Sequence, residues 1–367
     1  MAKFKKNIVR PSLFDYNVAL FGQQGVGKTT LAYQVCHKVV GDDYVIFNCG
    51  KEDGIKALPD AIYYDCPTWE EFDDIITEVV DERMTEYANL KVVVLDTIDE
   101  IFNMAEAEVI RLAKKKNPEK AITTINEAFG GFGAGLKKAE ELVLEALWRL
   151  KSVGINVFVI GHTKNKTMVD VINDGEYDIL TSNLSNRYFT EIATKMDVIG
   201  ICYVDRNIIA EKTNRKDIKG KTIERNVIAN EARKICFRSD DFVTASKSRF
   251  PDIEGVIDLN ADEFISAIET AIQKLIDKSS MSSEDIKKHY EAVDAENVKR
   301  LTEAGAKAKV EKQLDEIKAE IVNFFVENKT NIDAIKPALE LCKKNGFSNP
   351  NEIDNLDVAK KVLAACK

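Results

Sequence analysis

Residues 17–30 read NVALFGQQGVGKTT and are the most informative part of the sequence. A short apolar run ends at Gly22 and leads into the spacing GxxxxGK[ST], and residues 31–40, LAYQVCHKVV, follow with helical periodicity. The glycines at 22, 25 and 27 let backbone N–H groups turn inward onto phosphate oxygens without a Cβ clash. A strand, a glycine-rich loop and a helix in this order predict a phosphate-binding loop.

The residues of the loop also predict which ligand it binds. Lys28 brings a positive charge to the β- and γ-phosphates, Thr29 offers a hydroxyl to Mg²⁺, and the helix N-terminus adds its dipole. We therefore expect ATP and Mg²⁺ as cofactors. The residues expected to bind the nucleotide are Gly22, Gln23, Gln24, Gly25, Val26, Gly27, Lys28, Thr29 and Thr30.

A second signal lies on another predicted strand. Residues 91–96, KVVVLD, are a nearly continuous apolar run that ends in Asp96, as expected for a strand buried on both faces. Asp96 would lie at the carboxyl edge of the sheet beside the loop and hold the Mg²⁺ through water. Asp99 and Glu100 open a helical segment, so we expect them to cap that helix rather than to act in catalysis.

Candidates for the other catalytic roles follow two further predicted strands. Glu52 comes after a strand at 44–49, where a carboxylate can orient the water that attacks the γ-phosphate, and Asp53 is the competing choice. The run at 155–164 contains His162 near its end, and this histidine is either a sensor of the γ-phosphate or a structural residue.

The order of the elements predicts the fold class. Strands alternate with helices as far as 155–164, and two later β-rich runs, 197–205 and 232–240, flank a polar, basic stretch. We predict an α/β fold with a mostly parallel sheet, a β-hairpin appendage and a C-terminal helical region.

Taken in order, these features resemble the RecA/RadA-like ATPase core. The matching features are the loop at 22–29, a carboxylate after the second strand, Asp96, the pair Gly161-His162, Asp197-Val198, and Lys247-Ser248-Arg249. The resemblance covers about 15–258 and is strongest to phage-encoded recombination ATPases of the Sak type. One departure is His162, where RecA-type proteins usually carry glutamine.

The resemblance implies a RecA-like P-loop core with DNA-dependent ATPase activity. It implies a homo-oligomer, a ring or a filament, with Lys247 and Arg249 reaching the γ-phosphate held by the neighbouring subunit. It further implies single-stranded DNA and a single-stranded DNA-binding or annealing protein as partners. The implied location is the cytoplasm, that of a bacterial host if a phage encodes the protein.

Three segments are candidates for contact with DNA. The first combines a basic helix end with a glycine loop that carries an aromatic residue, a pattern suited to phosphate contact and base stacking. The second is the long connection 164–190, for which we expect no regular periodicity. Their named residues are Lys114, Lys115, Lys116, Phe132, Lys164, Lys166 and Arg187. The third is the basic hairpin: Arg206, Lys212, Arg215, Lys216, Lys219, Lys221 and Arg225.

Composition limits the remaining possibilities. The formal net charge of −9 argues against a broadly basic nucleic-acid coat, and no apolar run is long enough to span a bilayer. Seven scattered cysteines favour a reduced protein without a disulfide framework or a zinc site.

Composition also suggests the domains. We expect a core at 1–258 with a short arm at 1–14, a packing helix and linker at 259–280, and a helical, acidic interaction module at 281–367.

Two other functions fit the same sequence. One is a DnaB-type helicase or a helicase loader. The other is a protein in which ATP only gates assembly and the C-terminal module recruits partners. Stimulation of hydrolysis by single-stranded DNA separates the DNA-dependent enzymes from the gated protein, and strand unwinding identifies the helicase.

Overall fold

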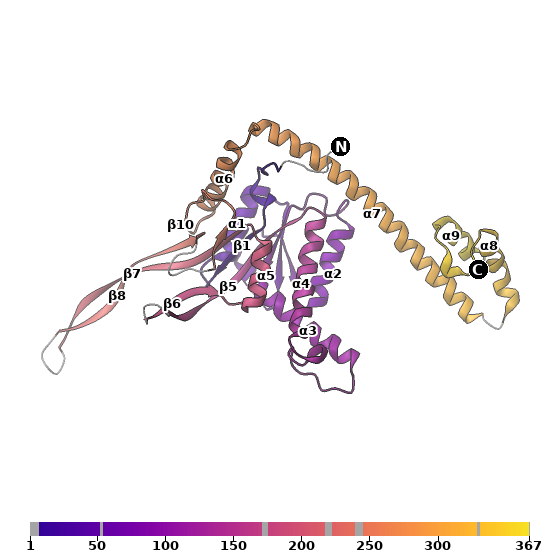
Figure 1. Cartoon of the computed structure of the whole chain (residues 1–367), viewed down its shortest axis with the longest axis horizontal. Coiled ribbons are helices and arrows are strands. Elements are labelled where there is room, and N and C mark those ends of the chain that lie inside the picture. The colour runs from indigo at the N-terminus through magenta and orange to yellow at the C-terminus, as the bar shows by residue number, and fades with distance from the viewer. Residues whose placement is uncertain are drawn as a thin grey trace. The chain divides into compact units, whose positions relative to one another are not determined.

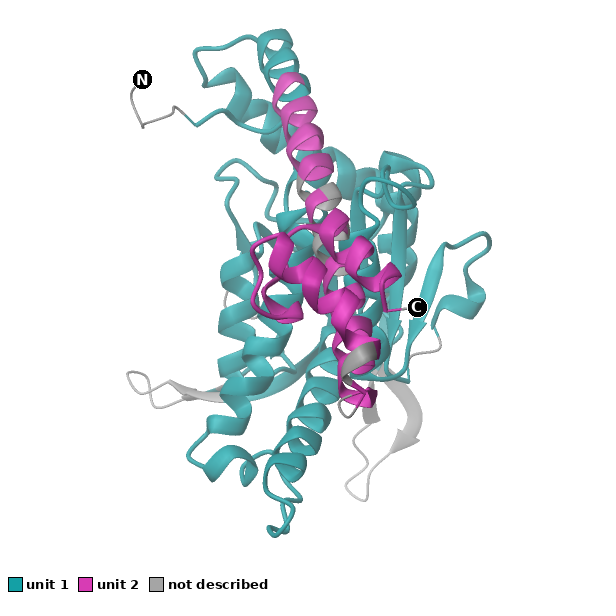
Figure 2. Cartoon of the chain, turned by 90° about the vertical axis from the view of Figure 1, so that its right-hand side faces the viewer, with its two compact units in different colours: residues 1–291 teal, residues 292–367 magenta. Residues whose placement is uncertain are grey.

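The computed structural model describes residues 7–51, 54–170, 175–216, 222–238, 245–328 and 331–366. The chain forms two compact units, residues 1–291 and residues 292–367, coloured separately in Figure 2. Each unit has its own apolar core.

A single twisted sheet forms the centre of the first unit (Figure 1). In spatial order its main path is β10 (Val256–Asp258), β8 (Thr222–Cys236), β7 (Val198–Lys216), β1 (Val18–Gly22), β5 (Asn156–Asp170), β4 (Val92–Asp96), β2 (Tyr44–Cys49) and β3 (Tyr63–Cys66). Neighbours from β7 to β3 run parallel, whereas β8 and β10 are antiparallel to their neighbours. The predicted α/β fold with a mostly parallel sheet is confirmed.

Helices cover the sheet because its central strands are apolar on both faces. Every residue of β1 and β4 is buried, as continuous apolar runs require. The helices of this unit are α1 (Lys28–Val40), α2 (Trp69–Asp81), α3 (Ile98–Lys116), α4 (Ala134–Ser152), α5 (Asn186–Lys195) and α6 (Ala261–Asp277). Short 3₁₀ turns lie at η1 (Leu13–Asp15), η2 (Gly54–Ala57) and η3 (Ala128–Gly130). The order of strands therefore puts the end of β1, with its loop, at the middle of the sheet.

Two strands extend beyond the sheet and form hairpins. β5 continues to Asp170 and pairs antiparallel with β6 (Gly175–Ser182), so the expectation of an irregular connection at 164–190 is wrong. Most of the added residues, 163–170, are polar. They form a regular strand because they pair with β6, and a pattern of apolar residues does not predict such pairing. β7 and β8 form the predicted hairpin appendage, and β9 (Lys247–Ser248) pairs with the start of β7.

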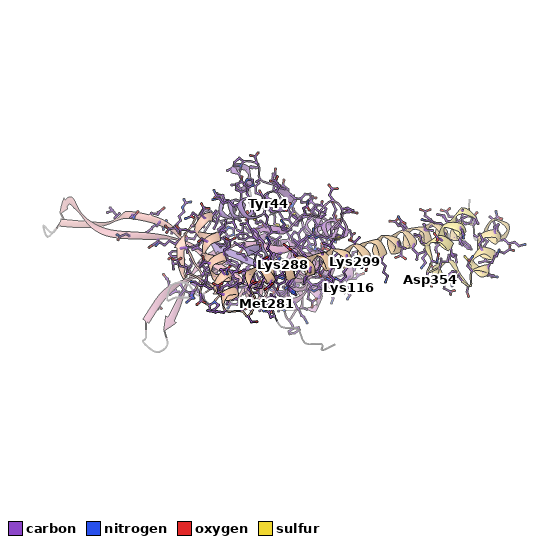
Figure 3. The ribbon with its side chains drawn as sticks, turned by 90° about the horizontal axis from the view of Figure 1, so that it is seen from above. Tyr44, Lys116, Met281, Lys288, Lys299 and Asp354 are labelled. Carbon is purple, nitrogen blue, oxygen red and sulfur yellow. The ribbon has the colours of Figure 1, made fainter. Side chains whose placement is uncertain are left out.

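The C-terminal region is helical, as predicted. The stretch 284–325 lies within one helix, α7 (Ser283–Glu327), which is followed by α8 (Ile332–Lys344), η4 (Pro350–Glu352) and α9 (Leu356–Ala364). The second unit has a small core that includes Ile321, Cys342, Ile353 and Val362. Figure 3 labels Lys288 near the start of α7 and Asp354 just before α9.

The charge of this region corrects one expectation. From 284 to 367 the chain has 16 acidic and 15 basic residues, so the region is close to neutral. The description of the module as acidic is therefore wrong, and its charge gives no reason for it to repel DNA.

The cysteines and the helices bear on what composition suggests. All seven cysteines are free and buried. Among the described residues, no helix is both long and apolar enough to cross a membrane.

Candidate nucleotide-binding site

The loop between β1 and α1 has the backbone geometry that its glycines predict. Gly25 and Gly27 have φ angles of 76° and 108°, in the left-handed region that residues with a Cβ rarely adopt. Gly22 lies against β7, where an added Cβ would stand 2.7 Å from the carbonyl oxygen of Cys202. Gly27 is the N-cap of α1 and supplies no side-chain cap, so the first turn of the helix presents its amides to a ligand.

Lys28 is folded over this loop. Its side chain is buried, with 6% of the residue exposed, and the Nζ atom donates to the carbonyl oxygens of Gly22 (2.9 Å) and Gln23 (3.0 Å). Such an ammonium group is a point charge beside the amides that would receive phosphate. The loop thus combines inward N–H groups with one buried cation.

Thr29 and Asp96 come together at the carboxyl edge of the sheet. The Thr29 hydroxyl donates to Oδ2 of Asp96 at 2.8 Å, and Asp96 is only 3% exposed. Mg²⁺ prefers oxygen ligands and retains several of its waters in phosphate sites. A hydroxyl and a carboxylate side by side next to a phosphate loop therefore fit the ion that the sequence predicts.

Several buried polar atoms at the same edge have no hydrogen-bond partner among the described residues. They are Oδ1 of Asn48, Oγ1 of Thr97, Oδ1 of Asp99 and Oγ1 of Thr163. Asn48 lies at the end of β2 and is the register partner of Asp96, and Thr97 and Asp99 follow β4. Thr163 lies on β5, one residue beyond the register partner of Gly22. Buried polar atoms normally have partners, so this cluster fits a site that receives a polar ligand and water.

His162 is the register partner of Gly22 and so lies on the strand beside the loop. Asp99 accepts from the backbone N–H of His162 at 2.8 Å, and the same oxygen is 3.3 Å from Nδ1 of the ring. Asp99 therefore holds β5 at His162 and does not cap α3 as expected; the N-cap is Thr97, whose side chain makes no capping bond. The role of His162 as a sensor stays a prediction.

The two candidates for the catalytic base, Glu52 and Asp53, lie outside the described residues. Glu100, however, reaches the same region from the first turn of α3. A Cβ at Gly50, directly after β2, would collide with the Glu100 carboxylate. Burial and the neighbouring Cys66 raise the pKa of Cys49, with Asp96 and Glu100 adding smaller effects, which agrees with carboxylates close to the end of β2.

Lys247 and Arg249 lie at the opposite edge of the sheet from the loop in their own chain. Lys247 pairs in register with Ile199 near the start of β7, and its Nζ donates to the carbonyl oxygens of Ala193 (2.6 Å) and Met196 (3.0 Å). Arg249 forms an ion pair with Asp197 at 2.9 Å. Both cations therefore hold the end of α5 within the chain, and their action on a neighbouring subunit stays a prediction.

The structure brings two of the DNA candidates together. An NH1 atom of Arg187, on α5, lies 3.8 Å from where a Cβ on Gly133 would stand, next to the fully exposed Phe132. Lys114, Lys115 and Lys116 form the last turn of α3, and Lys116 is labelled in Figure 3. Lys164 donates to the carbonyl oxygen of Asn183 at 3.1 Å, and Lys166 is exposed on β5.

The basic hairpin is described only in part. Arg206 pairs with Glu231 at 3.0 Å. The side chains of the other basic candidates on this hairpin lie outside the described part of the chain.

Sequence reasoning missed Asn48 and Arg233 as parts of this edge. Asn48 is a polar residue at the end of an apolar strand, a signal that the pattern contained. Arg233, on β8, places NH1 3.4 Å from the carbonyl oxygen of Val26 in the loop. Nothing local in the sequence around residue 233 indicates this contact, because it depends on the pairing of β8 with β7.

One family model matches the part of the chain that holds this site. No curated protein matches the chain. Among solved structures, an ATPase from the type III secretion system of pathogenic bacteria is similar at 12% identity with a TM-score of 0.33, and the match spans 51% of this chain and 51% of that one. Residues 15–236 match the family described as "AAA domain", which is more than half of the chain. The chain therefore belongs to the AAA domain family and is a P-loop nucleoside triphosphate hydrolase.

Proposed function

We propose that this ATPase acts on single-stranded DNA in homologous recombination or annealing, as the phage-encoded Sak-type proteins that it resembles do. The observation that carries the proposal is the surface formed by the loop 129–133 with Arg187 and the end of α3. This surface combines an exposed aromatic ring with cations, and those two features together suit single-stranded nucleic acid.

Phe132 is the stacking element of the proposal. It is fully exposed, has a φ angle of 51°, and lies between Gly131 and Gly133, which also have positive φ angles. A large apolar side chain at a loop tip gains nothing from water, whereas a base can stack on it from either face. Every base has such a face, so this contact carries no sequence preference.

Cations next to the ring supply the phosphate contacts. Arg187 reaches Gly133, and Lys116 lies with Nζ 5.8 Å from the centre of the Phe129 ring. Arg187 also pairs with Glu140 at 2.5 Å, which reduces but does not remove its capacity to meet a phosphate, since a guanidinium has five donors. Lys114 and Lys115 extend the basic surface along α3.

α3 connects this surface with the nucleotide site. The helix begins two residues after Asp96 and ends at Lys116, so one rigid element of about 28 Å joins the two. Figure 1 shows α3 and the loop after it extending past the sheet. This connection supports hydrolysis that responds to DNA.

The catalytic assignments that complete the proposal follow the site. Lys28 neutralises charge on the β- and γ-phosphates, and Thr29 with Asp96 holds Mg²⁺, which supplies further neutralisation when bound. Glu52 or Asp53 orients the attacking water, and His162 senses the γ-phosphate. In a ring or filament Lys247 and Arg249 would leave their contacts with α5 and act on the neighbouring subunit, and the C-terminal unit would recruit an annealing or single-stranded DNA-binding protein.

The test is the affinity of the full chain for a fluorescent oligothymidylate, measured by anisotropy. Phe132→Ala should weaken binding by roughly fivefold to a hundredfold, the range for loss of one stacked base. The matched control is Trp148→Ala, which removes an aromatic side chain that is 66% exposed on α4, away from the loop. Equal affinities for wild type and Phe132→Ala would contradict the proposal.

A further inference from the structure

The base of the β7–β8 hairpin lies beside the phosphate loop. Gly22, the last residue of β1, is the register partner of Cys202 on β7. Two residues further along β7, Val204 pairs with Arg233 on β8. Arg233 therefore lies just beyond the carboxyl edge of the sheet, where the loop turns above β1.

The side chain of Arg233 points to the loop. Its NH1 atom is 3.4 Å from the carbonyl oxygen of Val26 and 3.6 Å from where a Cβ on Gly27 would stand. The backbone is held as well, because the N–H of Leu259 donates to the carbonyl oxygen of Arg233 at 2.8 Å. The guanidinium thus stands on a supported strand beside the first turn of α1.

Its neighbours on the hairpin have acidic partners. Lys234 lies 3.8 Å from Asp205, and Arg206 lies 3.0 Å from Glu231. None of the ion pairs formed by the described residues involves Arg233. Among the same residues, its guanidinium makes one hydrogen bond, the long one to the carbonyl oxygen of Val26. An arginine kept beside a phosphate loop with donors to spare is suited to an anion, since a guanidinium meets phosphate oxygens in a fork.

The order of the strands in the sheet indicates which phosphate of the nucleotide lies near Arg233. Thr29 and Asp96 mark the metal side of the loop, toward β4, where the γ-phosphate lies. Arg233 lies on the other side of β1, beyond β7. We propose that Arg233 binds the α-phosphate end of the nucleotide held by the loop of its own chain.

The test compares ADP with a non-hydrolysable ATP analogue in calorimetric titrations of the full chain with Mg²⁺. Arg233→Ala should weaken both ligands by the same factor, about tenfold to a hundredfold, because both carry an α-phosphate. Arg233→Lys should recover part of the loss, since it restores the charge without the fork. The matched control is Lys234→Ala, which removes the neighbouring cation on β8, paired with Asp205, and should leave both affinities unchanged.

Three results would overturn the proposal. Unchanged affinity for ADP in Arg233→Ala means that the residue does not touch the nucleotide. A larger loss for the ATP analogue than for ADP places the guanidinium at the γ-phosphate instead. A lower melting temperature without nucleotide, combined with normal ADP affinity in Arg233→Lys and Arg233→Ala, means that Arg233 only supports the loop.

Discussion

Thr29 and Asp96 are 67 residues apart in the chain, and a hydrogen bond of 2.8 Å joins them at the sheet edge. If the pair holds Mg²⁺, Asp96→Asn removes the negative charge but keeps the shape. We expect the Mg²⁺ concentration for half-maximal hydrolysis to rise by at least about tenfold, the scale for losing one interaction with a charged group. A titration of the ATPase rate with Mg²⁺ measures this shift. Thr29→Ser, which keeps the hydroxyl, should behave like wild type, and an unshifted midpoint in Asp96→Asn would refute the assignment.

Lys28 is the buried cation of the loop, and its replacement should be more severe. Lys28→Ala is expected to abolish detectable hydrolysis and to weaken ATP affinity, because the phosphates lose the point charge that neutralises them. Steady-state phosphate release and an ATP titration measure the two effects. The control is Lys38→Ala near the far end of α1, where the lysine pairs with Asp262 on the surface. Substantial turnover in Lys28→Ala would show that another group carries this role.

At the residue scale, the sequence predicts the site residues that belong to a local motif. It misses residues that only the fold brings close to the site. The loop residues and Asp96 follow from a motif within a strand–loop–helix unit and from a strand that ends in a carboxylate. Arg233 could not be assigned in this way, because its closeness to the loop depends on strand pairing across the sheet. Asp99 could not be assigned correctly either, since its partner is the backbone of His162, 63 residues away.

At the scale of elements, α3 and the loop after it form the proposed DNA surface. Replacing Lys114, Lys115 and Lys116 together by alanine should reduce the slope of log affinity against log salt. Each lost phosphate contact on a single strand lowers that slope by about 0.7, so three contacts correspond to a change of about 2. Oligothymidylate binding at several salt concentrations measures it. A single Lys151→Ala change at the end of α4 is the control, and an unchanged slope in the triple variant would move the phosphate contacts to another element.

Apolar patterns predicted the elements that lie in the core and failed for those stabilised by pairing alone. β4 is buried at every position and was predicted to within one residue. The extension of β5 beyond His162 has no apolar alternation, and it is regular because Thr163 to Asp170 pair with β6. β3 was missed because its tyrosines are exposed at the edge of the sheet.

For the whole molecule, the boundary between the compact units should decide which truncation folds. The first unit ends at residue 291, inside α7, and includes Ile286, which is fully buried against the main core. A chain of residues 1–291 should therefore fold and bind ATP. A chain of residues 1–280 loses Ile286, and loss of a fully buried isoleucine side chain costs roughly 2–5 kcal/mol. Thermal melting of the two truncations measures the difference, and equal melting temperatures would show that the start of α7 does not stabilise the core.

The central claim is that DNA bound at the loop 129–133 controls ATP hydrolysis at the sheet edge. Its most direct test is the steady-state ATPase rate of the full chain with and without saturating oligothymidylate, for wild type and Phe132→Ala. We expect single-stranded DNA to raise the wild-type rate severalfold. Phe132→Ala should keep the basal rate but lose most of this stimulation at the same DNA concentration. Equal wild-type rates with and without DNA, at a concentration where binding is shown to be complete, would contradict it.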